Sequence, residues 1–398
     1  MTTTHGSKPV LIAGAGIGGL SAAIALARAG IPTLVVDRVK AFSPEGAGIQ
    51  LGPNATRILA DWDVLDYLEK DAVASEGIII GDGISGAQLN MVPFGASAEL
   101  HFGAPFLLAH RADLHNALLK TARSHNCITI KLNCTVTGFR QDPDGASIQT
   151  STGSIEGDGL ICADGTWSTL RDHVDEGASL RFTGRTAWRT LLDADQVPKA
   201  AREPWTRLWL APKAHVVHYP VSNGKKINVV AVIDDAAGDQ IDGWNGQADT
   251  SQLYPAFAHW NEHVAQMVFS GPEWRKWPLY MSPPLRNWMI DRIVLLGDAA
   301  HPVLPFLAQG GAMAIEDAAV LGKEISKGGT ELPEAFRSFE LARIERTART
   351  SYESRKLGNI YHMGGLARAA RDFVLRLRKP LSLRERYEWL YGFRVTDD

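Results

Sequence analysis

The sequence VLIAGAGIGGLSAAIALARAG, residues 10–30, decides the fold of this chain. Its first four residues, Val10–Ala13, are apolar and have the length of a short buried strand. Gly18–Ala29 then shows helical periodicity, and Gly30 is a natural stop for a helix. The next apolar run, Thr33–Val36, reads as a second strand, so the chain is expected to open with a βαβ unit.

The stretch Gly14–Gly19 matches the pattern G-x-G-x-x-G between the predicted strand and the predicted helix. In this context Gly14 permits a tight turn, Gly16 lets a pyrophosphate approach the backbone, and Gly19 lets helix and strand pack closely. The helix start offers unpaired N–H groups and a positive dipole end to the phosphates. Asp37 ends the second strand, where a carboxylate can hold a ribose hydroxyl. A glycine-rich turn that binds nothing is the alternative.

A second match to the same pattern, Gly81–Gly86, is interpreted differently. It follows the apolar run Ile78–Ile80, and the residues after it, Ala87–Val92, alternate between apolar and polar as a strand does. No helix start is there to receive a phosphate. This stretch therefore predicts a hairpin turn.

The composition limits the class of protein. With 398 residues, 45% of them hydrophobic, the chain is expected to form two packed units. A formal charge of −3 gives no reason to expect a nucleic-acid or anionic-membrane partner. No run reaches the roughly 18 apolar residues of a membrane span, and Met1–Lys8 lacks the apolar stretch of a signal peptide. Cys127, Cys134 and Cys162 have no metal-ligand spacing, so we expect no metal site and a reducing, cytoplasmic location.

Strands and helices alternate along the rest of the chain. Ala112–Ser124 reads as a helix, residues 180–232 are rich in predicted strand, and Ile293–Leu296 is one more buried strand. A long helix is expected to start near Gly310, and the tail from Arg343 onward is expected to be helical. Shorter predicted strands are Ile128–Lys131, Val136–Gln141, Ala146–Thr150 and Gly159–Cys162.

Motifs beyond the first unit resemble those of one enzyme family. CADGTWS, residues Cys162–Ser168, followed by Arg171, resembles the DG motif of class A flavoprotein monooxygenases. GDAAHP, residues Gly297–Pro302, resembles their GD motif, and Gly46–Leu51 and His110–Leu114 are similar to further family signatures. These elements follow the family's order over nearly the whole chain. The likeness is greatest to the salicylate, 3-hydroxybenzoate and 6-hydroxynicotinate hydroxylases.

The resemblance implies an α/β fold with a Rossmann-like FAD-binding domain, as in para-hydroxybenzoate hydroxylase. It also implies an interleaved, mainly antiparallel β-sheet substrate domain and a C-terminal helical segment. The FAD-binding domain is expected to be discontinuous, over residues 1–75, 105–180 and 285–345. The substrate-binding domain is expected over residues 76–104 and 181–284, and the C-terminal helices over residues 346–398.

FAD is implied as the tightly bound cofactor, with NADH or NADPH as a transient co-substrate because only one dinucleotide fold is visible. Asp298 ends the last predicted strand and can accept a bond from a ribityl hydroxyl, with a helix N-cap as the alternative. The N–H groups of Gly311 and Ala312 can stabilise negative charge on the flavin. The cofactor-binding residues that the resemblance implies are Gly14, Gly16, Gly19, Asp37, Arg38, Gly48, Gln50, Arg111, Asp164, Asp298, Gly311 and Ala312.

Three charged residues lie in or near these motifs, and each is expected to interact with a cofactor. Arg111 at a predicted helix start opposes the helix dipole, so an anion is expected nearby, and the resemblance implies the FAD phosphates. The alternative for Arg111 is a plain surface position. Asp164 and Arg171 are expected to serve FAD and the approach of NAD(P)H, with a surface ion pair as the alternative.

The stretch HVVHYPV, residues 215–221, predicts the substrate side of the site. Side chains alternate faces along a strand, so His215, Val217 and Tyr219 share one face and His218 points the other way. Hydroxylases of 3-hydroxybenzoate and 6-hydroxynicotinate have a histidine and a tyrosine at this spacing in their active sites. His215, helped by Tyr219, is therefore expected to deprotonate a ring hydroxyl, with a structural histidine as the alternative. His218 is expected to be structural.

Pro305 follows Asp298 by seven residues, where the family places a proline whose carbonyl faces the reactive edge of the flavin; a simple turn is the alternative. Phe306 stands where the nicotinate-type enzyme has a histidine, and the 3-hydroxybenzoate type has glutamine in place of the proline. No single substrate is therefore carried over. Arg189 could bind a substrate carboxylate or form a structural ion pair.

These motifs predict an FAD-dependent monooxygenase that hydroxylates a small phenolic ring of the hydroxybenzoate or hydroxypyridine type. NAD(P)H and O₂ are the expected co-substrates, acting through a flavin hydroperoxide. The alternatives are a family member that oxidises a natural product, by epoxidation or aliphatic hydroxylation, and a non-enzymatic FAD-binding protein. Whether the protein is a homodimer is left open.

Overall fold

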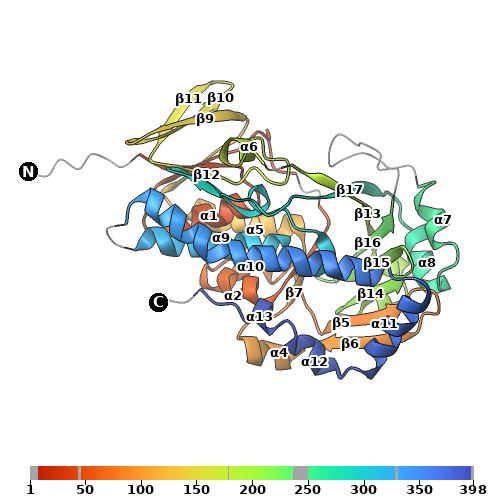
Figure 1. Cartoon of the computed structure of the whole chain (residues 1–398). Coiled ribbons are helices and arrows are strands. Elements are labelled where there is room, and N and C mark those ends of the chain that lie inside the picture. Colours follow the sequence, from red (N-terminus) through yellow and green to blue (C-terminus); the bar gives the residue numbers. More distant parts are fainter. Residues whose placement is uncertain (1–7, 44–45, 178, 236–249, 328–329, 396–398) are drawn as a thin grey trace, which may run out of the picture.

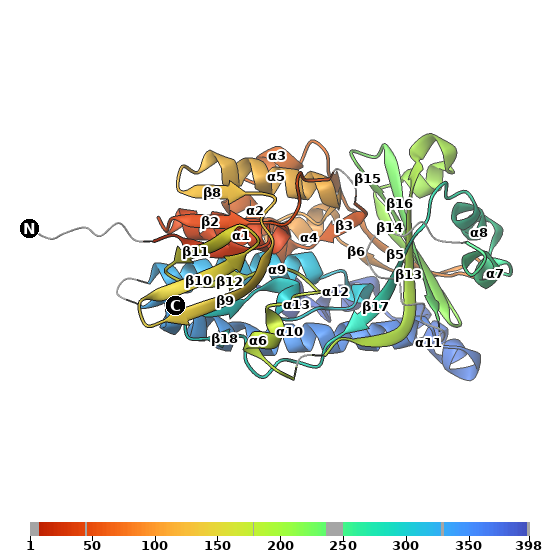
Figure 2. The same ribbon diagram turned by 90° about the horizontal axis from the view of Figure 1, so that it is seen from above.

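The computed structural model of the chain describes residues 8–43, 46–177, 179–235, 250–327 and 330–395. Nearly all of the polar segment Met1–Lys8 therefore lies outside the described residues. The two largest sheets lie at opposite ends of the molecule, and long helices run between them (Figures 1 and 2). Within the described part of the chain, no helix has both the length and the apolar character needed to cross a bilayer.

A six-stranded sheet carries the opening motif. Its strand order is β18-β19-β12-β1-β2-β8, and every neighbouring pair is parallel except β18 with β19. The helix α1 (Ile17–Arg28) connects β1 with β2, so the predicted βαβ unit is confirmed. The strands are β1 (Val10–Ala13), β2 (Thr33–Val36), β8 (Ile128–Lys131), β12 (Leu160–Cys162), β18 (Met289–Ile290) and β19 (Ile293–Leu295).

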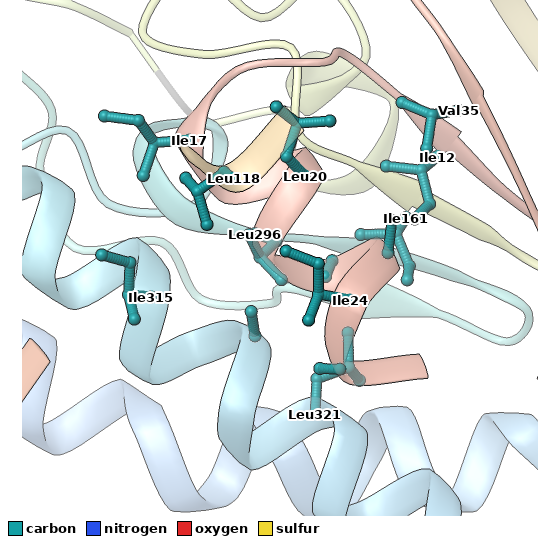
Figure 3. Packing of buried hydrophobic residues seen from close by; sticks show 14 of the residues in the cluster. Ile12, Ile17, Leu20, Ile24, Val35, Leu118, Ile161, Leu296, Ile315 and Leu321 are labelled. Atoms are coloured by element: carbon teal, nitrogen blue, oxygen red, sulfur yellow. The ribbon is translucent and has the colours of Figure 1, made fainter. Parts of the chain in front are cut away.

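The core beside this sheet is built around α1 (Figure 3). Leu20 and Ile24 of α1 are fully buried and belong to one cluster with residues of the sheet and of α9 (Gly310–Ser326). Small residues let α1 and α9 approach closely, because a Cβ added at Gly322 would lie 2.8 Å from the Cβ of Ala25. Since burial of a leucine or isoleucine contributes about 1.5–3 kcal/mol, this cluster fixes α1 and the turn before it.

Two three-stranded sheets flank the first sheet. One is the antiparallel sheet of β9 (Val136–Asp142), β10 (Gly145–Thr150) and β11 (Gly153–Gly157). The strand β11 was not among the strands predicted from sequence. The other consists of β3 (Gly48–Leu51), β7 (Leu107–His110) and β4 (Val73–Ala74).

A seven-stranded sheet forms the second large layer, in the order β17-β13-β16-β15-β14-β5-β6. All neighbours are antiparallel except β14 with β5. The second glycine pattern forms the β5–β6 turn, where Asp82 accepts the N–H groups of Ile84 and Ser85, so the predicted hairpin is confirmed. The strands are β5 (Gly77–Asp82), β6 (Gln88–Pro93), β13 (Arg181–Asp193), β14 (Trp205–Ala211), β15 (Ala214–Val221), β16 (Lys226–Asp234) and β17 (Arg275–Met281).

Helices cover both faces of the seven-stranded sheet. On one face, α7 (Leu253–Phe257) and α8 (Glu262–Phe269) pack against buried side chains that include Trp188 and Trp274. The other face looks toward α10 (Leu332–Tyr361), α11 (Gly365–Leu377), α12 (Pro380–Glu385) and α13 (Glu388–Tyr391). The remaining α-helices are α2 (Pro53–Asp61), α3 (Leu65–Leu68), α4 (Gly95–Phe102), α5 (Arg111–Ser124) and α6 (Arg171–Val174).

The long helix α10 runs from the α1–α9 region to the seven-stranded sheet (Figure 1). The boundary predicted between residues 345 and 346 therefore falls inside one continuous helix. Buried charges hold α10 to α9. Arg343 of α10 is fully buried and pairs with Glu316 at 2.8 Å and with Asp317 at 2.7 Å, both on α9. Arg346 pairs with Glu316 at 2.7 Å, so the position of α10 depends on this network.

Arg343→Met should lower the free energy of unfolding by about 3–5 kcal/mol, because it leaves two buried carboxylates with less compensation. Arg337→Met on the same helix is the matched control. The Arg337 side chain is 58% exposed, and its buried partner Glu340 still accepts the N–H of Trp288 at 2.7 Å, so removal of Arg337 should cost only about 1 kcal/mol. Denaturant unfolding followed by circular dichroism measures both variants. Equal losses would contradict the importance of the buried network.

Candidate functional site

The three glycine- and aspartate-containing motifs meet at one edge of the six-stranded sheet. The strands β1, β12 and β19 are parallel neighbours, so the turns that follow them lie side by side. Gly14 has a φ of 109°, and a Cβ there would lie 2.3 Å from the carbonyl oxygen of Ala163. On the other side, Thr166 Oγ1 donates a hydrogen bond to Asp298 Oδ2 at 3.1 Å. Residues far apart in sequence therefore form one site.

Two glycines of the opening turn have different surroundings. A Cβ added at Gly19 would lie 1.9 Å from the carbonyl oxygen of Gly14, so glycine is required there for α1 to pack on β1. A Cβ added at Gly16 would have no other heavy atom within 4 Å. The open side of Gly16, next to the N-terminus of α1, could receive a phosphate group.

Charged residues flank this turn. Asp37 accepts the N–H of Ala15 at 2.7 Å and the N–H of Val39 at 3.0 Å, so its carboxylate also orders the turn. Arg38 is exposed beside it. Arg111 begins α5, is exposed, and has no acidic partner among the described residues. Both arginines could therefore reach an anion at the turn.

Arg171 joins the second motif to the third. It is buried, and its Nε donates to the carbonyl oxygen of Ala299 at 2.6 Å while Nη2 donates to that of Asp298 at 2.7 Å. Asp164 accepts the N–H of Thr169 at 3.2 Å, and its Oδ1 is buried without a hydrogen-bond partner from the described part of the chain. Burial raises the pKa of Asp164. The surface ion pair considered from sequence does not form, and Asp164 Oδ1 could accept a hydroxyl of a cofactor.

Besides the turns after β1, β12 and β19, the strand β3 and the start of α9 also contribute residues to the site. The first bond within α9 runs from the N–H of Met313 to the carbonyl oxygen of Gln309 at 2.8 Å, so Gly311 and Ala312 lie in the first turn with N–H groups free for a ligand. A Cβ at Gly311 would lie 2.8 Å from Ile49 of β3. The N–H of Gly48 in the same strand donates to Asn228 Oδ1 at 2.7 Å, which ties β3 to the seven-stranded sheet.

A cavity of about 540 Å³ lies between the seven-stranded sheet and the C-terminal helices. Its wall on the sheet is mostly apolar and includes Leu208, Val217 and the imidazole of His215. Gln50 of β3 and the 3₁₀ turn Pro305–Leu307 also line it, which connects the cavity with the edge where the motifs meet. The volume is in the range of small-molecule sites.

The side chains of β15 alternate between the two faces of the sheet, as the sequence predicts. His215 and Val217 line the cavity, whereas Val216 belongs to the core on the other face. Burial lowers the pKa of His215 well below 6.5, and the neighbouring His362 and Arg185 lower it further, so the imidazole is neutral. Tyr219 lies on the same face but is buried against Gly48 of β3, near Gln50. Burial raises the pKa of Tyr219, so this residue keeps its proton.

His218 lies on the opposite face of β15. Its Nε2 accepts the indole N–H of Trp209 at 3.0 Å, and the planes of the two rings are nearly parallel, at 14°. Burial, with a smaller contribution from Arg207, lowers the pKa of His218 to about 3. These contacts support the structural role predicted for His218, whose Nδ1 is buried without a hydrogen-bond partner in the described part of the chain.

Pro305 opens a 3₁₀ turn on the cavity wall. Its carbonyl oxygen accepts the N–H of Ala308 at 3.0 Å, so part of the hydrogen-bonding capacity of this carbonyl is used by the turn itself. Phe306 packs on His215 with the ring centroids 5.5 Å apart. The segment therefore fixes one side of the imidazole.

Arg189 is partly buried on β13 and lies on the same sheet face as Val217, because both residues pair with Val230 of β16. Its guanidinium lies 4.8 Å from the ring centroid of Trp277, and its Nε has no hydrogen-bond partner among the residues that the structure describes. No ion pair of Arg189 is found in the described ranges, so the structural ion pair considered from sequence does not form. A partly buried cation without an acidic partner among the described residues is suited to an anionic ligand.

Sequence reasoning missed the residues behind His215. His362, at the end of α10, and Asp234, at the end of β16, complete a hydrogen-bonded series with His215. Neither residue lies in a recognisable motif. The one usable signal is a histidine at the boundary of a helix, and that signal does not point to a strand 147 residues earlier.

Comparisons with known proteins agree with this geometry. The chain matches the family model described as FAD binding domain over residues 7–333. It is 32% identical over 396 residues to the 3-hydroxybenzoate 6-hydroxylase of Polaromonas naphthalenivorans (strain CJ2), covering 99% of this chain and 98% of that protein. It is 34% identical over 351 residues to the 6-hydroxynicotinate 3-monooxygenase of Bordetella bronchiseptica, covering 87% and 90%.

Among solved structures, HpxO of Klebsiella pneumoniae complexed with FAD and uric acid is similar, with a TM-score of 0.84 and 26% identity. The match covers 96% of this chain and 95% of that one.

Proposed function

The chain belongs to the FAD binding domain family, and from that premise we propose that this flavoprotein monooxygenase hydroxylates a small phenolic ring carrying an acid group. NADH or NADPH and dioxygen are the proposed co-substrates. The observation that carries the proposal is the neutral His215 on a largely apolar cavity wall, beside the turn that follows the GD motif. Such a base can take the proton of a ring hydroxyl and make the ring more nucleophilic.

We assign the residues around the sheet edge to FAD. Gly14, Gly16 and Gly19 would shape the turn at the pyrophosphate. Four charged residues would hold the adenosine, the phosphates and the ribityl chain: Asp37, Arg38, Arg111 and Asp298. Asp164 would accept a cofactor hydroxyl, and the ring would lie near Gly48, Gln50, Gly311 and Ala312. When bound, FAD supplies the redox chemistry, namely hydride acceptance from nicotinamide and activation of dioxygen.

This assignment supports the division of the chain proposed from sequence. Residues 1–75, 105–180 and 285–345 would form the FAD unit, and residues 76–104 and 181–284 the substrate unit. The strand composition of the two large sheets supports it. We also propose a cytoplasmic location, supported by three cysteines that form no disulfide.

The spacing of His215 and Arg189 supports the proposed substrate class. The two residues lie two strands apart and are offset by two residues along the sheet, which places their Cα atoms roughly 12 Å apart. A ring with a hydroxyl at His215 and a carboxylate toward Arg189 would span the space between the side chains. The relatives are named for 3-hydroxybenzoate and 6-hydroxynicotinate, which both combine these two groups.

Gly16→Ala should weaken FAD binding by about tenfold or more, because the new methyl group occupies the space proposed for a phosphate. The apoprotein should keep its stability to within about 0.5 kcal/mol, since a Cβ there meets no other atom within 4 Å. Gly19→Ala is the contrasting variant and should destabilise the apoprotein itself by about 1–3 kcal/mol. Flavin fluorescence titration and apoprotein melting measure the two effects. Unchanged FAD affinity in Gly16→Ala would contradict the placement.

His215→Gln should lower kcat for a phenolic substrate by about 10²–10⁴-fold, the usual contribution of a general base. His218→Gln, on the other face of the same strand, is the matched control and should retain most of the activity. Because the pKa of His215 is lowered, the base stays deprotonated as the pH falls through 6.5, and activity that depends on it is lost only below that value. Product formation by liquid chromatography across pH 5–9 checks both statements; full activity of His215→Gln would argue for chemistry that needs no phenolate.

Arg189→Met should raise KM for a carboxylated substrate by about ten- to a hundredfold, the effect of losing a charge-assisted hydrogen bond. The methionine keeps much of the packing on Trp277. The matched control is a substrate pair, 3-hydroxybenzoate and 3-hydroxybenzamide, since the uncharged amide should lose far less. Steady-state kinetics with both compounds measures the difference, and equal losses would place the substrate acid elsewhere.

A further inference from the structure

A continuous series of hydrogen bonds leads from the cavity wall to the surface. His215 Nδ1 lies 2.8 Å from His362 Nε2, and both rings are buried. His362 Nδ1 lies 2.6 Å from Asp234 Oδ1. The Asp234 side chain is 38% exposed, so the series ends in contact with solvent.

The chemistry of these groups fixes the direction of each bond. Burial would raise the pKa of Asp234, but bonds and charges from His362 and Arg185 outweigh burial and lower it, so the carboxylate is ionised. An ionised carboxylate only accepts, so His362 Nδ1 carries the proton. In the neutral imidazole His362 Nε2 is then an acceptor, and His215 Nδ1 must donate to it. His215 Nε2 is left as the unprotonated atom, as a base on the cavity wall requires.

The surroundings hold this series in place. Arg185 donates to Asp234 at 3.1 Å and to Asn359 Oδ1 at 3.0 Å, which ties β13, β16 and α10 together. Tyr361 packs on the His215 ring with the centroids 5.3 Å apart. The charged groups that face His362 are Asp234, which favours its protonated form, and Arg185 and Arg371, which oppose it. His362 also ends α10, where the negative end of the helix dipole favours a transient positive charge.

We propose that His362 and Asp234 form a proton relay that connects His215 with solvent during deprotonation of the substrate. The proposal rests on the proposed function, since His215 must be the base. His362 and Asp234 do not touch the substrate in this scheme. They act through His215 and are therefore positioning and relay residues rather than catalytic ones.

The relay conserves protons at each step. A substrate hydroxyl gives its proton to His215 Nε2, and the proton on His215 Nδ1 passes to His362 Nε2. The proton on His362 Nδ1 passes to Asp234, which releases it to water. One proton leaves the substrate and one reaches solvent. When a proton returns to the substrate oxygen, the same steps in reverse restore the starting tautomers.

The test measures proton release directly. The oxidised holoenzyme is mixed with 3-hydroxybenzoate in weakly buffered solution that contains a pH indicator, and stopped-flow absorbance follows both the indicator and the ultraviolet band of the bound phenolate. His362→Gln is compared with the wild type because glutamine can hydrogen-bond on both sides but cannot pass a proton along. Asn359→Ala is the matched control, since it loosens the same junction without removing a proton carrier.

We expect His362→Gln to slow proton release about tenfold or more, with the affinity for 3-hydroxybenzoate changed less than about threefold. Imidazole added to His362→Ala should restore part of the rate, and Asp234→Asn should slow release because the terminal acceptor loses its charge. Asn359→Ala should release protons at close to the wild-type rate. Far-UV circular dichroism and FAD content show whether each variant is folded. If His362→Gln does not fold, Asp234→Asn still tests the relay.

Wild-type proton release in both folded variants, with normal hydroxylation by the wild type, would overturn the relay and leave the proposed function standing. A wild type that forms no hydroxylated product from hydroxybenzoates or hydroxynicotinates would overturn the proposed function, and the relay with it. Equal slowing in His362→Gln and Asn359→Ala would show that His362 is only a structural residue.

Discussion

The parallel register of β1, β12 and β19 is the constraint on which the rest of the site depends. It brings together turns that begin at residues 14, 163 and 296 of the chain, because parallel neighbours end at the same edge. Arg171 makes this edge rigid by donating to main-chain carbonyls of the third turn. A backbone held in this way presents N–H groups and acceptors at fixed positions. Little of the protein's conformational entropy is then lost when it binds a long dinucleotide.

The second constraint is the alternation of side chains along β15. Because successive residues face opposite sides of the sheet, two histidines three residues apart have opposite environments. His215 meets the cavity, Phe306 and the end of α10, whereas His218 meets Trp209 in the sheet's other core. The helix α10 links this sheet to the dinucleotide side through Arg343, so the same element that buries charge at one end positions His362 at the other.

Sequence reasoning succeeded where a feature depends on neighbouring residues. The opening βαβ unit, the β5–β6 hairpin and the faces of His215 and His218 all follow from local periodicity and turn chemistry. It failed where the partner comes from a distant element. Nothing local shows that Tyr219 would pack against Gly48 of β3, or that Arg189 would find no acidic partner among the described residues. The contact of His215 with His362 joins residues 147 positions apart and needs the completed fold.

Burial of His215 has two opposing effects on its action as a base, and His362 and Asp234 bear on the second of them. Desolvation keeps the imidazole neutral and ready to accept a proton, but it also disfavours the imidazolium that accepting a proton would create. A buried histidine with no outlet would therefore return the proton to the phenol. In the proposed relay, the proton would move along His362 to Asp234, whose side chain is 38% exposed and paired with Arg185, so water could solvate the added charge. In the proposed relay, the largely apolar cavity would hold the substrate, and the exposed carboxylate of Asp234 would exchange the proton with water.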